Sequence, residues 1–287
     1  MGLRRRLTGL PSKLPKFLPF LRPGFARLCV QSVAGKRGLE VGGPSSAFRD
    51  DAFIPVYRSL ASLDGCNFRS ATIWEGFLQE GQTYQFLDGR EPGYQYLLEA
   101  TDLSPIESGA YEAVVSAHML EHSADPIKAL VEWIRVIRTG GILLLVLPHK
   151  DGTFDRRRPC TTLSHMKEDH EKDVGEDDLT HLPEILELHD LTRDPPAGDP
   201  EAFRVRSLDN LNNRGMHHHV FDIRTAVELV DHVGLQILVA DTAKPFHIVI
   251  LARKQEGADN SAFLSSDSPS FAHSRFPSDR SNPSTRR

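Results

Sequence analysis

The segment from 125 to 147 restricts the fold more than any other part of the chain. Apolar residues recur at helical spacing over 125–138, Asp125 can cap the first turn, and Pro126 suits the first helical position. Gly140 ends this helix, and 142–147 then forms a continuous apolar run. A strand buried on both faces has this composition. The segment therefore predicts a helix that leads into a central strand of an α/β sheet.

The rest of the chain alternates in the same way. Two further helices are expected at 23–34 and 223–232. Strands are expected at 38–42, 60–63, 96–100, 113–116, 235–241 and 247–252. Repeated strand–helix units predict a doubly wound, mostly parallel sheet, and the final pair of strands predicts an antiparallel edge.

Composition excludes some functions. The formal net charge of −5 argues against a nucleic-acid partner bound by bulk electrostatics, although a local basic patch stays open. Cys29, Cys66 and Cys160 are odd in number and form no CxxC pair, so neither a disulfide framework nor a cysteine zinc site is indicated. A reducing, cytoplasmic setting fits this usage. No run reaches the roughly 18 apolar residues that a transmembrane segment needs.

Both ends of the chain differ from its middle. Residues 1–22 form a basic leader whose short apolar pieces are too interrupted for a signal peptide. We expect this leader to be flexible, with weak contact to anionic lipid as the alternative. Residues 255–287 are rich in Ser, Pro, Asp and Arg and are expected to be a disordered tail.

Glycines and acids fall where predicted strands end. The stretch Gly-Leu-Glu-Val-Gly-Gly-Pro-Ser at 38–45 places glycines at a strand-to-turn junction, where the backbone can approach a ligand closely. Asp64 follows the second strand and could accept both hydroxyls of a ribose. Asp102 follows the third and could accept from an adenine amino group. Each feature alone also fits a turn or a solvated loop, but their order favours one ligand at the carboxyl ends of the strands.

The stretch Tyr-Glu-Ala-Val-Val-Ser-Ala-His-Met-Leu-Glu-His at 111–122, followed by Asp125-Pro126 and the turn Thr139-Gly140-Gly141, resembles a known family. It is similar to class I S-adenosylmethionine-dependent methyltransferases, and more narrowly to the type 11 methyltransferase-domain group. The resemblance is dense over 111–148 and moderate over 38–103. It implies a methyltransferase domain over 23–254, a Rossmann-like seven-stranded sheet with an antiparallel last strand, and S-adenosyl-L-methionine as cofactor.

The resemblance also implies which residues bind the cofactor. Glu40, Gly42 and Gly43 would face its methionine part, and Asp64 would hold the ribose. The adenine would be bordered by Asp102 and Leu103, and the sulfonium by Ser116, Ala117 and His118. The chain departs from the family pattern at Pro44 and Ser46, which occupy later glycine positions, and at Thr139, where a proline is usual. The first departure affects the shape of the methionine pocket.

The acceptor side is less determined. Methyl transfer needs an in-line nucleophile, and a general base only if that nucleophile carries a proton. His122 and His149 follow the fourth and fifth strands and are the candidate bases. The polar stretch 149–219 is expected to be a substrate-side insertion, with Arg158, His181, Arg214 and His218 as candidate contacts. Its histidines and acids could also bind a metal, but their spacing matches no metal signature, and no metal ligand is assigned.

Three other functions compete with this interpretation. A nicotinamide-dependent oxidoreductase would need Gly-x-Gly-x-x-Gly, which 42–47 does not supply. A non-catalytic cofactor-binding or regulatory module is compatible with the altered glycine turn. A metal-dependent hydrolase could use the His/Asp-rich insertion. The preferred hypothesis is methyl transfer to a small-molecule, sugar or lipid-linked acceptor, on oxygen, with no nucleic-acid partner.

Overall fold

The computed structural model describes residues 24–72 and 76–280, so the predicted leader at 1–22 lies outside the described residues. Its main sheet has eight strands in the order β5-β6-β2-β1-β7-β8-β10-β9. The strands of this sheet are β1 (Arg37–Val41), β2 (Ser62–Asn67), β5 (Gly81–Tyr84), β6 (Gly93–Leu97), β7 (Tyr111–Ala117), β8 (Ile137–Pro148), β9 (Gln236–Ala243) and β10 (His247–Arg253). Strands β3 (Ala71–Thr72) and β4 (Gly76–Phe77) form a separate short hairpin.

Parallel pairing joins β6, β2, β1, β7 and β8, while β10 runs antiparallel to both β8 and β9. This confirms the α/β fold with a mainly parallel sheet and an antiparallel pair at its end. The sheet has eight strands instead of seven because β5 adds an antiparallel edge strand beside β6. The sequence signal for β5 is weak, since three of its four residues are Gly, Gln and Thr.

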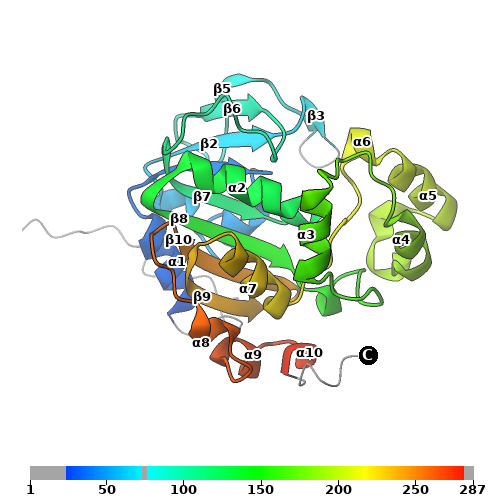
Figure 1. The fold of residues 1–287 in the computed structure, drawn as a ribbon. Coiled ribbons are helices and arrows are strands. Elements are labelled where there is room, and N and C mark those ends of the chain that lie inside the picture. The colour runs from blue at the N-terminus through cyan, green and yellow to red at the C-terminus, as the bar shows by residue number, and fades with distance from the viewer. Residues whose placement is uncertain (1–23, 73–75, 281–287) are drawn as a thin grey trace, which may run out of the picture.

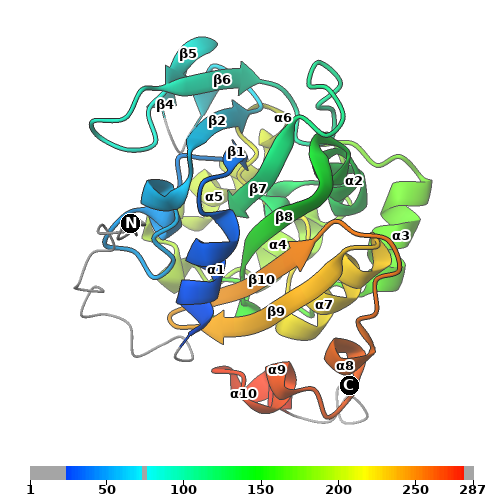
Figure 2. The same ribbon diagram turned by 90° about the vertical axis from the view of Figure 1, so that its left-hand side faces the viewer.

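Helices cover both faces of the sheet (Figures 1 and 2). On one face, α2 (Pro126–Val136) and α7 (Ile223–His232) bury Trp133 and Leu229 in the larger apolar core. On the other, α1 (Phe25–Val33) packs with Phe48 and Tyr57 from the β1–β2 connection. That connection contains the 3₁₀ turns η1 (Ser46–Phe48) and η2 (Tyr57–Ser59) in place of an α-helix.

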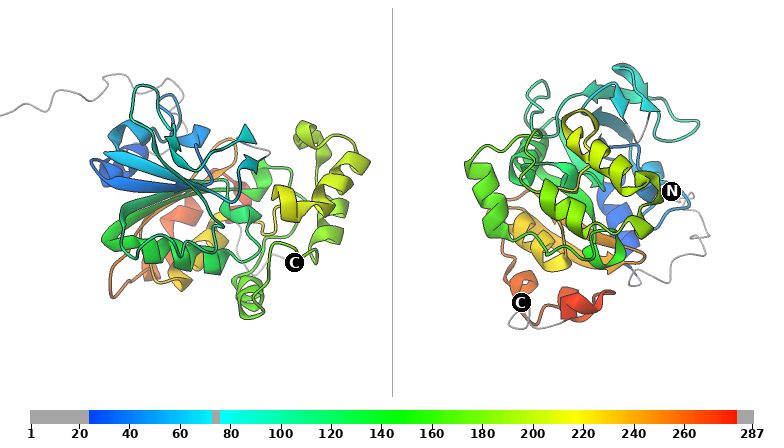
Figure 3. Two further views of the ribbon diagram at one scale, coloured as in Figure 1. Left: turned by 90° about the horizontal axis from the view of Figure 1, so that it is seen from above. Right: turned by 90° about the vertical axis from the view of Figure 1, so that its right-hand side faces the viewer.

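The insertion after β8 is mostly helical. Its helices are α3 (Leu163–Glu171), α4 (Leu182–Leu188), α5 (Pro200–Leu208) and α6 (Asn210–Asn213), with short 3₁₀ turns η4 (Lys150–Gly152), η5 (Leu191–Arg193) and η6 (Pro195–Ala197). Figure 3 shows α4, α5 and α6 grouped beyond one end of the sheet. Because they have their own small core around Ile185 and Phe203, they form a cap at that end.

The disordered tail predicted for 255–287 is wrong for its described part. Residues 261–280 form α8 (Ser261–Leu264), α9 (Pro269–Ala272) and α10 (Pro277–Arg280). Phe271 and Phe276 are both buried, and the Ser270 hydroxyl donates to the Ala240 carbonyl at 2.8 Å. Two aromatic anchors in a polar segment bury enough apolar surface to order it. None of the helices in the described residues is long and apolar enough to span a bilayer.

Candidate functional site

A cavity of about 370 Å³ opens at the carboxyl ends of β1, β2, β6 and β7. This volume lies in the range of small-molecule and cofactor sites, and an open α/β sheet places its ligands here. Its lining includes Gly42, Asn67, Glu99, Ala117, His118 and His122 from the sheet side. Glu176 and Arg214 from the insertion also line it, so the cap helps to enclose the space.

Gly42 allows the chain to turn sharply after β1. Its φ is +80°, a conformation that favours glycine, and a Cβ there would lie 2.4 Å from Met119 Cγ. Its N–H donates to the Cys66 carbonyl at 2.9 Å. The turn therefore sits close to the Met119 side chain, which also lines the cavity.

Glu40 holds this turn from behind instead of facing the cavity. Its carboxylate is buried and accepts hydrogen bonds from the hydroxyls of Tyr57 and Tyr84 at 2.8 and 2.7 Å and from the Ser45 N–H at 3.0 Å. A Cβ on Gly43 would lie 2.3 Å from both the Glu40 carboxyl carbon and the Tyr84 hydroxyl. The prediction that Glu40 and Gly43 face a ligand is thus corrected, because these protein groups already surround the carboxylate.

Asp64 and Asp102 also lie elsewhere than predicted. Strand β2 continues to Asn67, so Asp64 lies within it, where its carboxylate accepts from Tyr111 at 2.7 Å and pairs with Arg37. Asp102 is exposed and accepts from the Ser104 N–H at 3.0 Å. Neither lines the cavity, and the strand ends instead place Asn67 and Glu99 there.

Two other predicted cofactor contacts are structural. Leu103 is fully buried in the core, and Ser116 donates to the Val41 carbonyl at 2.9 Å, which ties β7 to β1. By contrast, Ala117 and His118 line the cavity as Gly42 does. His118 has a φ of +55°, a strained conformation for a non-glycine residue, and such strain is common at functional sites.

Three of the four predicted acceptor contacts bind other residues of the insertion instead of facing the cavity. Arg158 is buried and donates to Asp155 at 3.0 Å and to Glu184 at 2.8 Å. His218 lies 3.0 Å from the Asn210 amide, and His181 lies 3.1 Å from His165. None of these three predicted contacts lines the cavity, which corrects their assignment.

Arg214 does line the cavity. It donates to Glu99 at 2.6 Å and lies over the Phe68 ring, so it links the cap to the end of β6. Its Nε and the Glu176 Oε2 lie 3.9 Å apart, and within the described structure neither atom has a hydrogen-bond partner. Burial raises the pKa of Glu176 to about 7. Polar side chains therefore line this part of the cavity.

His149 is not a base facing the cavity. It is fully buried, stacks on Phe276 at 3.8 Å between ring centroids, and its Nε2 lies 3.0 Å from the Asp279 carboxylate. Both partners, Phe276 and Asp279, belong to the carboxyl-terminal segment that the sequence pattern alone predicts to be disordered. The histidine therefore anchors that segment.

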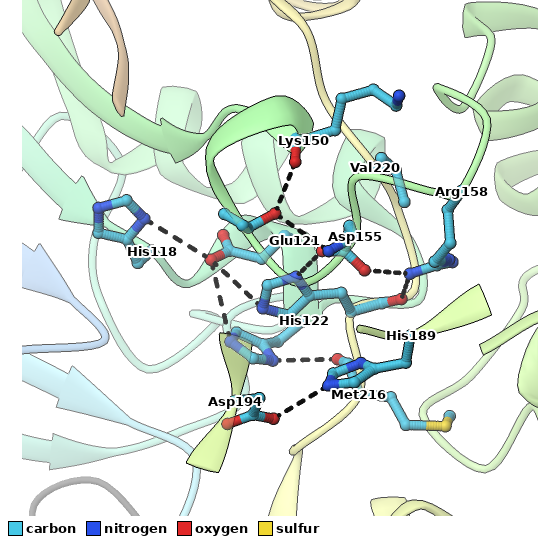
Figure 4. A network of polar contacts seen from close by, with 12 residues as sticks. His118, Glu121, His122, Lys150, Asp155, Arg158, His189, Asp194, Met216 and Val220 are labelled. Atoms are coloured by element: carbon cyan, nitrogen blue, oxygen red, sulfur yellow. Dashed lines mark hydrogen bonds and ion pairs between the residues drawn. The ribbon is translucent and has the colours of Figure 1, made fainter. Parts of the chain in front are cut away.

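His122 lies in the cavity wall beside the Glu121 carboxylate. Contacts from several side chains converge on that carboxylate in Figure 4. His122 Nδ1 lies 3.0 Å from the Met216 carbonyl, and because a carbonyl only accepts, Nδ1 carries the proton. Burial and the neighbouring His217 hold the pKa of His122 well below its usual value. Its Nε2 is therefore unprotonated at neutral pH.

His217 is held in a similar way by Asp155, with Nδ1 2.6 Å from the carboxylate. Burial alone would raise the pKa of Asp155, but His217 and Arg158 outweigh it and lower that pKa to about 2. The Asp155 carboxylate is thus ionised and accepts the Nδ1 proton. Burial raises the pKa of Glu121 to about 7, and burial with His247 and His217 lowers that of His118 to about 3.

Sequence reasoning missed Asn67, Glu99 and Glu121 as groups of this site. Glu121 stands within the Leu-Glu-His element, but its spacing gives no sign of a buried side chain. Asn67 and Glu99 depend on where β2 and β6 end, and the weak patterning of 65–95 leaves those ends undetermined.

An α/β sheet with a cavity at its strand ends, a glycine turn after β1 and a cap over the opening is the arrangement of a Rossmann-like methyltransferase fold. Residues 57–145 match the family model described as methyltransferase domain. These residues form a methyltransferase domain of the type 11 group. S-adenosylmethionine is accordingly its cofactor.

Similar solved structures include three methyltransferases. An S-adenosylmethionine-dependent methyltransferase from Aquifex aeolicus is 9% identical, with 80% of this chain and 89% of that chain covered and a TM-score of 0.42. The 1,6-didemethyltoxoflavin-N1-methyltransferase of Burkholderia thailandensis is 12% identical, with 82% and 78% covered and a TM-score of 0.46. A third, from Mesorhizobium loti, is 12% identical, with 79% and 95% covered and a TM-score of 0.43. The search of curated proteins finds no match.

Proposed function

We propose that the chain transfers a methyl group from S-adenosylmethionine, bound in the cavity, to an oxygen atom of a small-molecule, sugar or lipid-linked acceptor. The observation that carries this proposal is the cavity itself, which joins the glycine turn after β1 to the His-containing end of β7 under a polar cap. The net charge of −5 favours such an acceptor over a nucleic acid.

The cavity residues fit the parts of the cofactor. Glu99 and Asn67 present oxygen atoms at neighbouring strand ends, where ribose hydroxyls can donate to them. Arg49 lines the rim near the glycine turn and can pair with the carboxylate of the methionine part. Gly42 and Met119 would contact the methionine chain, while Ala117 and His118 would lie beside the sulfonium.

When bound, S-adenosylmethionine supplies an electrophilic methyl group on sulfur. The chain's own residues then have three tasks. The cap excludes water, with Arg214 tied to Glu99 across the opening. The walls orient the acceptor, and orientation can supply most of the rate. The unprotonated Nε2 of His122 can accept a proton or bind a cation at the acceptor side.

Calorimetric titration with S-adenosylhomocysteine tests the placement of the cofactor. Glu99→Gln should weaken binding about tenfold, because a charge-assisted hydrogen bond contributes about 1.5–3 kcal/mol. Asp102→Asn is the matched control: this acid lies three residues away and outside the cavity, so affinity should stay within about twofold. Equal losses in both variants would contradict the proposed cavity.

Turnover distinguishes an enzyme from a binding module on the same fold. Purified protein should release S-adenosylhomocysteine when supplied with hydroxylated small molecules or sugar precursors. Tight binding of S-adenosylhomocysteine without turnover on any acceptor class would favour the non-catalytic alternative.

A further inference from the structure

Four side chains converge on one buried point at the wall of the cavity. Glu121 Oε1 lies 3.9 Å from His122 Nε2, 4.0 Å from His217 Nε2 and 3.9 Å from His118 Nδ1. Glu121 is 1% exposed, and its other oxygen has no hydrogen-bond partner among the described residues. A buried carboxylate without a close donor is costly unless it takes up a proton or a cation compensates it.

The facing nitrogens of His122 and His217 cannot supply that compensation as neutral rings. Each ring carries its proton on Nδ1, which donates to the Met216 carbonyl in one case and to Asp155 in the other. In its neutral form, each ring therefore presents the Nε2 lone pair toward Glu121. A proton added to either ring would still face the carboxylate across 3.9–4.0 Å, too far for a hydrogen bond.

These separations suit a metal ion. Tetrahedral bonds of about 2.0–2.2 Å place two donor atoms roughly 3.3–3.6 Å apart, so these donors would move together by about half an ångström to bind an ion. One donor atom from each of Glu121, His122 and His217 lies within 4.8 Å of the others. Metal-binding histidines also hold their second nitrogen on a carboxylate or a backbone carbonyl, as both of these histidines do.

We propose that Glu121, His122 and His217 bind a divalent first-row transition-metal ion, such as Zn²⁺, Fe²⁺ or Co²⁺. Two imidazoles and one carboxylate form a donor set that suits these ions better than Mg²⁺ or Ca²⁺. His118 borders the same point. Because His118 and His122 both line the cavity, a position on the ion faces the acceptor side.

A second group of possible ligands lies between α3 and α4, with His165 and Asp169 on α3 and His181 just before α4. There the two imidazole Nε2 atoms are 3.1 Å apart, and His165 Nε2 is 3.2 Å from Asp169. His165 and His181 already hydrogen-bond each other, so their facing nitrogens have a partner without an ion. This group provides the control.

The role of the ion rests on the proposed methyl transfer. An acceptor hydroxyl that binds the ion would have a lowered pKa and would reach the methyl group as a better nucleophile. The O–H proton would leave to solvent, the new C–O bond would form, and the C–S bond would break. Metal binding itself does not depend on this step.

The experiment is a Co²⁺ titration of chelator-treated protein, followed by visible absorption and metal analysis. The wild-type chain should bind one Co²⁺ with ligand-field bands. His217→Gln and Glu121→Gln should each weaken Co²⁺ binding at least tenfold, and Asp155→Asn should weaken it about 10–100-fold through the orientation of His217. His181→Gln, the control from the second group, should keep wild-type affinity. Loss of Co²⁺ only in His181→Gln, or no binding by the wild type, would overturn the proposal.

A crystal of the wild-type chain soaked in Co²⁺ avoids any variant that fails to fold. An anomalous peak within bonding distance of Glu121, His122 and His217 is the expected result. A peak only at His165 and His181, or no peak, would overturn it. Titration with S-adenosylhomocysteine separates the two proposals: a Co²⁺-binding chain that does not bind S-adenosylhomocysteine refutes the proposed function, and the reverse result refutes the metal site.

Discussion

Replacing Gly42 by alanine tests whether the turn after β1 shapes the cavity. Gly42 has a φ of +80°, and an added Cβ would lie 2.4 and 2.6 Å from Met119 Cγ and Cβ. The left-handed backbone costs an alanine about 1–2 kcal/mol. Displacing the half-buried Met119 side chain adds about 1–3 kcal/mol, as for other overpacked sites. The free energy of unfolding should therefore fall by about 2–5 kcal/mol.

The matched control is Gly234→Ala. Gly234 also has a φ of +80°, but no atom lies within 4 Å of the added Cβ, and it follows α7 away from the cavity. This variant should lose only the backbone contribution of about 1–2 kcal/mol. The difference between the two variants measures the contact with Met119.

Denaturant unfolding gives the free energies, and calorimetry gives the affinity for S-adenosylhomocysteine. Gly42→Ala should weaken binding at least tenfold, because Met119 must move into the cavity that it lines. Gly234→Ala should leave binding within about twofold. If both variants bind S-adenosylhomocysteine as the wild type does, the turn does not shape a cofactor site and the reasoning fails.

Three further predictions concern the groups around the cavity and the carboxyl-terminal segment. His149→Phe should lower the free energy of unfolding by about 2–4 kcal/mol, because the buried Asp279 loses its imidazole partner. Turnover per folded molecule should match that of the wild type. A total loss of turnover in folded protein would instead indicate that His149 is a catalytic base. Burial raises the pKa of Glu176 from 4.5 to about 7, so between these pH values the folded chain holds a proton that the unfolded chain releases. The free energy of unfolding should therefore fall as pH rises from about 4.5 to 7. In denaturant unfolding, Glu176→Gln should show a flatter pH dependence than the wild type. Replacing both Phe271 and Phe276 by alanine should lower the free energy of unfolding by about 3–6 kcal/mol, because both rings are buried, whereas Ala272→Ser at an exposed position of the same segment should change it little; equal effects in thermal unfolding would contradict a packed segment.

The sequence predicts the elements with strong periodicity well. The helix expected at 125–138 is α2 (Pro126–Val136), and the one expected at 223–232 has the same bounds in the structure. The apolar run at 142–147 lies within β8, which has helices over both faces of the sheet. These elements bury most of their side chains, so their apolar pattern reports their position directly.

The candidate site is harder to predict because it depends on strand ends and on contacts between distant segments. Strand β2 begins two residues later than expected and ends four later, which moves Asp64 into the sheet and brings Asn67 to the cavity. The sequence suggests that Arg158 is free to bind an anionic group, but it forms ion pairs with Asp155 and Glu184, which lie 3 and 26 residues away in the chain. His149 is buried by a segment 130 residues further along. No local pattern records such long-range partners.

A structure of the chain crystallised with S-adenosylhomocysteine shows whether the cavity at the strand ends binds the cofactor. We expect the adenosyl group to lie between Asn67 and Glu99, and the sulfur atom to lie beside Ala117 and His118. Density for the molecule outside this cavity, or crystals that take up none of it at saturating concentration, would contradict the account.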